Sequence, residues 1–203
     1  MNSYPRFAEI KGIKYEINTD FRVALECNEI ANNSEIKDEE RSLAIIYLLF
    51  GEQGLNDYEN WNSLLRIAIK FLSCGKEIED EYDNEEKEEN MDYLQDWGYI
   101  RTSFFSDYAI DLDKEKMHWW RFYELLCGLS EKCILSRVRF IRDFDISQIK
   151  DSAEREKWIK QKEMVALKQT KNEKSSEEKR LDELFEKQLR RWVNWAKQMD
   201  ISK

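Results

Sequence analysis

Proline and glycine are scarce in this chain, and their scarcity bounds the fold class. The 203 residues include one proline and six glycines. A β-sandwich or β-barrel needs many tight turns, which these two residues usually make. The sequence therefore predicts a mainly α fold. Hydrophobic residues at 41% and aromatic residues at 13% are enough for one substantial core, even though 37% of residues are charged.

Metal-ligating and catalytic patterns are also missing. The four cysteines form no CxxC pair, and with a single histidine they predict no zinc site and no metal. Cys27 and Cys127 fall on apolar helical stripes, which predicts buried, reduced thiols. No phosphate-binding glycine loop, HExxH, GxSxG or dinucleotide fingerprint is present. His118 has no evident catalytic partner, so we expect a structural histidine and a protein that is not an enzyme and uses no cofactor.

No stretch of the sequence predicts a membrane span or a signal peptide. The longest apolar run, Leu43 to Phe50, has eight residues, whereas a membrane-spanning helix needs about 20. The first residues carry scattered charges and no long apolar run. We therefore expect a soluble, intracellular protein with no membrane partner.

Charge is distributed unevenly along the chain. The net charge is -9, but residues 1–149 carry 18 basic and 31 acidic side chains (-13), and residues 150–203 carry 15 and 11 (+4). This asymmetry is compatible with a homo-oligomer or with an oppositely charged partner. The acidic balance makes nucleic acid an unlikely partner. The alternative of weak nucleic-acid binding depends on the basic C-terminal third and on three arginines, Arg137, Arg139 and Arg142.

Periodicity predicts a helical bundle with a small N-terminal β-hairpin and a C-terminal amphipathic helical extension. Apolar alternation on both sides of Lys11–Gly12 predicts the hairpin. Helical stripes follow, with a loop predicted between Gly51 and Gly54 and close packing predicted at Gly98. We expect residues 1–167 to form the helical body, with an acidic loop at 76–90.

Two sets of apolar residues, each containing two tryptophans, are the candidates for binding a partner. Trp119 and Trp120 lie on a helix expected to follow Asp113 as N-cap, and neighbouring side chains there are about 100° apart. Both cannot point inward, so one is expected to line a groove or meet another subunit. Residues 168–203 predict a charged linker and an amphipathic helix. Its apolar face supplies the other candidate contacts, Leu189, Trp192 and Trp195.

The central region also resembles a known family. Residues 108–112, 118–122, 126–129 and 137–142 look like the core of the bacteriophage gene-product-fifteen family, and 149–151 and 154–167 look like its continuation. The resemblance covers roughly Tyr4 to Leu167. It implies a tail-assembly protein of tailed phages and prophages of Gram-positive bacteria, encoded beside the tape measure protein and acting in the host bacterial cytoplasm. No catalytic motif defines that family.

The function that the resemblance implies is that of a chaperone for the tape measure protein. Tape measure proteins are long and largely helical, and an amphipathic surface can cover the apolar stripe of another helix. The expected mechanism is masking of such stripes until tail-tube protein displaces the chaperone. A structural or regulatory phage protein is the alternative.

Overall fold

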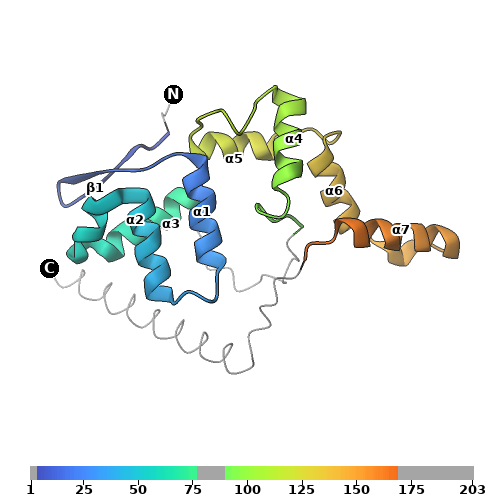
Figure 1. The fold of residues 1–203 in the computed structure, drawn as a ribbon, viewed down its shortest axis with the longest axis horizontal. Coiled ribbons are helices and arrows are strands. Elements are labelled where there is room, and N and C mark those ends of the chain that lie inside the picture. The colour runs from blue at the N-terminus through green and yellow to red at the C-terminus, as the bar shows by residue number, and fades with distance from the viewer. Residues whose placement is uncertain (1–3, 77–89, 169–203) are drawn as a thin grey trace. The chain divides into compact units, whose positions relative to one another are not determined.

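The computed structural model describes residues 4–76 and 90–168, and within these the chain is mainly helical (Figure 1). The predicted mainly α fold with a small N-terminal hairpin is confirmed. Most of the predicted acidic loop (77–89) and of the C-terminal extension (169–203) lies outside the described residues. The elements are β1 (Phe7–Ile10), β2 (Ile13–Glu16), α1 (Phe21–Asn32), α2 (Asp38–Asn56), η1 (Tyr58–Asn60), α3 (Trp61–Leu72), α4 (Trp97–Tyr108), α5 (Trp119–Cys127), α6 (Ile134–Asp143), η2 (Ile146–Gln148) and α7 (Ser152–Val165).

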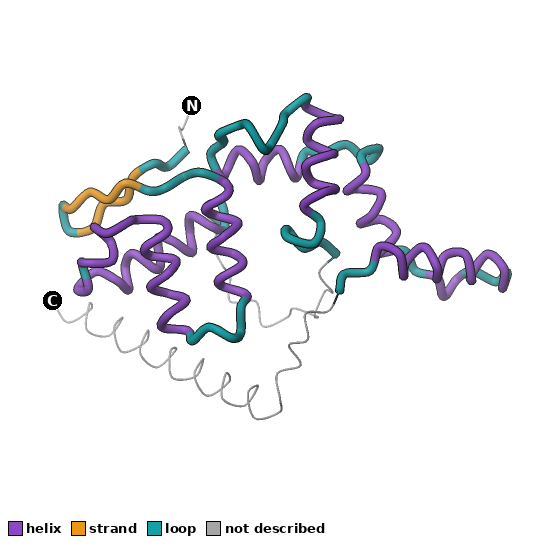
Figure 2. The backbone as a smooth tube through the Cα atoms, viewed as in Figure 1, coloured by secondary structure: helices purple, strands orange, loops and turns teal. Residues whose placement is uncertain are grey.

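The two strands pair antiparallel, with Ala8 opposite Tyr15 (Figure 2). Lys11 and Gly12 both have positive φ, which matches a tight hairpin turn. Tyr15 is fully buried, lies edge-on to Phe50 of α2 and donates a hydrogen bond to Asp57. An isolated hairpin is barely stable in water, so this packing on α2 is what holds the two strands.

Helix α2 continues past the loop that the sequence predicts between Gly51 and Gly54. That prediction is wrong: the helix runs to Asn56 and bends at Gly51, whose φ of 63° and ψ of -158° are non-helical. Glycine reaches this conformation without the steric cost of a Cβ. A kink at one glycine, rather than a loop, therefore joins the two halves of α2.

Helix α5 begins later than predicted and has a different cap. His118, rather than Asp113, is the N-cap, and its side chain accepts a hydrogen bond from the Trp120 N–H. Asp113 instead forms an ion pair with Arg101. The backbone at His118 is extended because it forms a bridge to Asp20, with the Trp119 N–H donating to the Thr19 carbonyl. This pairing delays the helix start.

Stacked aromatic rings from three helices, α1, α4 and α5, form the centre of the core. The Phe122 ring of α5 stacks on Phe21 of α1 at 4.7 Å and on Phe104 of α4 at 5.1 Å, measured between centroids. Trp119 stacks on Phe122 at 5.7 Å and donates its indole N–H to the Leu72 carbonyl at the end of α3. Aromatic pairs of this kind add to the stability from burial alone.

Helices α6 and α7 differ in how much of their surface is buried. The inner face of α6 is buried through Leu135 and Val138, but none of the residues of α7 is buried.

The sequence predicts close packing at Gly98 in α4, and this is wrong, since a Cβ built there would meet no atom within 4 Å. Helix α4 therefore approaches its neighbours elsewhere, through Ile100, Ser103 and Phe104.

Candidate partner-binding groove

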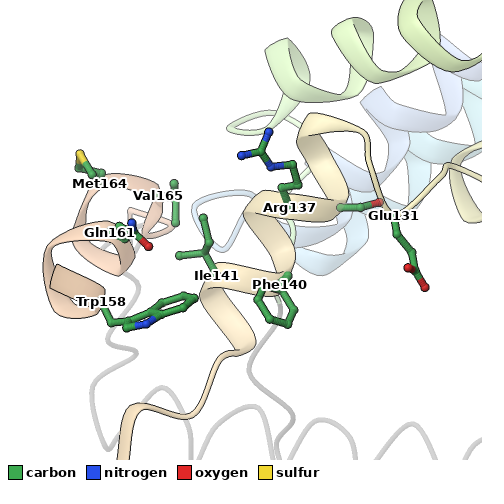
Figure 3. Close-up of a pocket in the computed structure, with 9 residues that line it drawn as sticks. Glu131, Arg137, Phe140, Ile141, Trp158, Gln161, Met164 and Val165 are labelled. Carbon is green, nitrogen blue, oxygen red and sulfur yellow. The ribbon is translucent and has the colours of Figure 1, made fainter. Parts of the chain in front are cut away.

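An open groove of about 750 Å³ lies between α6 and α7 (Figure 3). Its lining is mostly apolar, as Figure 3 shows for the two helices. Phe140 and Met164 are 60% and 75% exposed there. The lining residues are Glu131, Ser136, Arg137, Phe140, Ile141, Trp158, Gln161, Met164 and Val165.

An aromatic cluster holds the two helices together at one side of this groove. The Trp158 ring stacks on Phe144 with 4.0 Å between centroids and an angle of 12°. Phe140 meets the edge of Trp158 at 6.5 Å. Phe144 is in the segment that follows α6, so the stack fixes α7 against the end of α6. The outer part of Phe140 remains in solvent, which leaves an apolar surface open to another molecule.

Backbone capping sets where α7 begins. The Asp151 carboxylate accepts a hydrogen bond from the Glu154 N–H at 2.7 Å, as an N-cap does. Before it, Asp145 accepts from the N–H and the hydroxyl of Ser147, and these bonds hold the pKa of Asp145 below its ordinary value. Lys162 donates to the Phe144 carbonyl at 2.8 Å. The connection between α6 and α7 is thus fixed at both ends.

Arg142 connects the groove to the body of the fold. Its guanidinium forms a two-pronged ion pair with Asp96, with distances of 2.6 and 2.7 Å, and the Asp96 side chain is 1% exposed. The same group donates to the Val165 carbonyl at the end of α7 and to the Asn90 carbonyl. Paired donors of this geometry are strong and directional. Arg142 therefore fixes the end of α7 relative to α4.

These contacts weaken the case for nucleic-acid binding by Arg137, Arg139 and Arg142. Arg142 is committed to an internal ion pair, and the Arg139 Nε donates to the Asn90 side chain at 2.9 Å. Of the three arginines, Arg137 is the one that lines the groove. The basic face expected from the sequence is therefore smaller than its residue count indicates.

The structure separates the two tryptophans at the start of α5. Trp119 is 1% exposed and lies in the aromatic core, so assigning it to partner contact is wrong. Trp120 is partly buried, donates its indole N–H to the Phe71 carbonyl at 2.9 Å and lies 6.4 Å from the Tyr4 ring. Its role in partner contact stays a prediction. The remaining candidates, Leu189, Trp192 and Trp195, lie outside the described residues.

His118 uses both ring nitrogens in hydrogen bonds to backbone. Nδ1 accepts from the Trp120 N–H at 3.1 Å, and Nε2, 2.9 Å from the Pro5 carbonyl oxygen, is therefore the protonated nitrogen that donates to it. Burial lowers the pKa of His118, although the hydrogen bond to Pro5 opposes this. The Tyr4 ring stacks on the imidazole at 4.9 Å. The geometry is that of a neutral histidine that caps α5 and holds the N-terminal segment.

The four cysteines are free thiols, but they are not all buried. Cys27 is fully buried, and burial raises its pKa to about 12. Cys127 is exposed, so the prediction that it is buried on its helical stripe is wrong. Among residues 4–76 and 90–168, no group of three or more metal-ligating side chains is found. Within the same ranges, no helix has the length and hydropathy to cross a membrane.

Sequence reasoning did not find the groove. The apolar repeat at Leu135, Val138 and Ile141 predicts one face of α6, but it leaves Phe140 without a role. In the structure Leu135 and Val138 are buried, whereas Ile141 lines the groove. A signal was present in the sequence, since α6 and α7 each contain one aromatic residue, Phe140 and Trp158. Phe140, Phe144 and Trp158 come together only because the turn at 144–151 reverses the chain, and periodicity does not predict that reversal.

Fold and groove together define a mainly helical protein with a largely apolar groove open at its surface. The chain belongs to the family described as Bacteriophage Gp15 protein, whose sequence model matches residues 2–167. It is therefore a phage protein, and the resemblance noted in its sequence is confirmed. No curated protein and no solved structure matches it.

Proposed function

We propose that this phage protein is a non-enzymatic tail-assembly chaperone that binds the tape measure protein in the host bacterial cytoplasm. The observation that supports this role best is the open groove between α6 and α7, with Phe140 and Met164 largely exposed. Apolar grooves between helices are a common mode of binding an amphipathic helix. Membership of a phage family makes a phage assembly component a natural partner.

The mechanism that we propose is masking. A long helical protein exposes apolar stripes before it is packed inside a tail tube, and such stripes promote aggregation. The groove would cover one stripe at a time, with Phe140 and Trp158 in contact with its apolar side chains. Because the groove is open to solvent, the bound helix could be released when tail-tube protein competes for the same stripe. Trp120 and the segment with Leu189, Trp192 and Trp195 would add contacts outside the groove.

Co-expression tests this function. The tagged full chain and the tape measure protein encoded beside it are produced together, and the soluble tape measure protein is followed by pull-down and light scattering. We expect co-purification and suppressed scattering. Phe140→Ser should weaken both, whereas Phe105→Ser is a matched control because Phe105 is 64% exposed on α4 and does not line the groove. A tape measure protein that aggregates equally with and without this chain would contradict the proposal.

A further inference from the structure

The groove and a neighbouring hollow together follow the length of α7. Helix α7 has 14 residues, which corresponds to about 21 Å at the usual rise. A second hollow lies on the other side of Trp158, lined by Asp151, Ala153, Glu154, Lys157, Trp158 and Gln161. Trp158 and Gln161 line both hollows, so the two form one surface along α7. A surface of this length corresponds to about four turns of a partner helix.

The net charge of residues 131–168, which contain the groove, differs from that of the other described residues. Residues 131–168 carry ten basic and seven acidic side chains, a net of +3. Residues 4–76 and 90–130 together carry 13 basic and 19 acidic side chains, a net of -6. The groove is therefore in the basic part of an otherwise acidic structure.

Several charged side chains of residues 131–168 already form hydrogen bonds or ion pairs within the fold. Asp145 and Asp151 accept backbone N–H groups as caps, and Glu156 pairs with Lys160 at 2.7 Å. Two cations likewise bond to backbone carbonyls. Arg155 donates to the Ile149 carbonyl, and Lys162 to the Phe144 carbonyl.

Two cations remain at the rims of the surface. Arg137 lines the main hollow and Lys157 lines the second one, and neither forms an ion pair with a described residue (Figure 3 labels Arg137). Glu131 and Glu154 also lie at the edges and work against an acidic partner locally. Arg142 is paired with Asp96 outside this region, and the remaining basic side chains of residues 131–168 still outnumber the acidic ones by two.

From this complementarity, we infer that the groove selects an amphipathic helix whose apolar stripe is flanked by acidic side chains. The apolar stripe would cover Phe140, Ile141 and Met164, and the flanking carboxylates would face Arg137 and Lys157. The inference rests on the proposed function, since the bound segment would be a helix of the tape measure protein with this pattern. The partner is defined by an apolar stripe together with acidic flanks.

Two designed peptides test the inference with the full chain. Both are about 18 residues long, or five helical turns, with the same Leu and Trp stripe. One has Glu and the other Lys at the flanking positions, and binding is measured by fluorescence anisotropy at low salt. We expect the Glu peptide to bind about tenfold more tightly, and the difference to shrink as salt is added.

Charge-reversal variants locate the effect. Arg137→Glu combined with Lys157→Glu should weaken the Glu peptide about tenfold. Arg66→Glu with Lys70→Glu is the matched control, since it makes the same change of net charge on exposed positions of α3 and should have no effect. Phe140→Ser should weaken both peptides, and Phe105→Ser neither. The six substituted side chains of these four variants are all exposed, so the circular dichroism spectrum should not change.

Three outcomes would overturn the inference. One is equal or tighter binding of the Lys peptide, and another is a preference for Glu that survives the Arg137 and Lys157 reversal. The third is self-association of the chain that Phe140→Ser abolishes and the Glu peptide does not displace, because a second copy would then occupy the groove. A tape measure protein that aggregates despite an intact Glu preference would overturn the proposed function and support the groove specificity.

Discussion

The aromatic centre and the α6–α7 groove are both rich in large apolar side chains, but they differ in what covers them. In the centre, Phe122 is fully buried between Phe21 and Phe104. In the groove, Phe140 has similar aromatic neighbours and is still 60% exposed. The same residue type therefore stabilises the fold in one region and is available to a partner in the other.

The two regions should differ most in the free energy of unfolding that is lost when Phe122 or Phe140 is truncated to alanine. Phe122→Ala should lower the free energy of unfolding by about 3–5 kcal/mol, because it opens a cavity within the stack. Phe140→Ala should lower it by less than about 1 kcal/mol, since most of its side chain is already in solvent. Urea denaturation followed by circular dichroism measures both. Equal losses would mean that the groove is part of the core.

The ion pair between Arg142 and Asp96 tests how firmly the groove is attached to the core. Arg142→Ala should cost about 3 kcal/mol, because it leaves the buried Asp96 without its partner. Arg142→Met together with Asp96→Leu should recover part of this loss, as the stranded charge is then removed. Denaturation curves give both values. A double variant no more stable than Arg142→Ala would show that the backbone bonds to Asn90 and Val165 dominate.

The cap of α5 should make the packed region sensitive to pH. The pKa of His118 is lowered in the fold, so the unfolded chain binds more protons than the folded chain between the two pKa values. The contribution of the cap is therefore complete above about pH 6.5 and is lost as the pH falls through the folded pKa. The loss should reach up to about 1 kcal/mol, the usual contribution of an N-cap.

His118→Asn is the control for that titration, because asparagine also caps helices and does not titrate near neutral pH. Thermal melts between about pH 7.5 and 5.5 should fall more steeply for the natural chain than for His118→Asn. Parallel curves would show that another group causes the pH dependence.

The smallest expected effect is an increase in stability. Gly98→Ala in α4 should raise the free energy of unfolding by about 0.5 kcal/mol, since alanine favours the helix and a Cβ there would meet no atom within 4 Å. Thermal melting measures the change. A loss of stability would show that close packing occurs at this position after all.

The parts of the fold that sequence predicts well are those set by local chemistry. Alternation around Lys11–Gly12 was sufficient for the hairpin, and the apolar stripes were sufficient for most helices. The errors at Gly51 and Asp113 have a tertiary origin. At Gly51 the helix resumes after the kink and Gly54 of its second part is buried, and at His118 a bridge to Asp20 keeps the chain extended.

The candidate site was predicted less well for a similar reason. Sequence shows that Trp119 and Trp120 differ in direction, but only packing shows that Trp119 is the inner one. Arg142 looks like a surface residue because Asp96, its partner, is 46 residues away. The groove itself depends on a chain reversal between α6 and α7, which places Phe140 and Trp158 together.

Hydrogen exchange with mass spectrometry on the full chain, with and without the tape measure protein, tests the central claim most directly. We predict that binding slows exchange in residues 134–165, which include α6 and α7, and that the centre, represented by α5, changes little. Phe140→Ser should remove that protection, and Phe105→Ser should retain it. Protection confined to α1–α3, with α6 and α7 unchanged, would contradict the claim that the groove is the binding site.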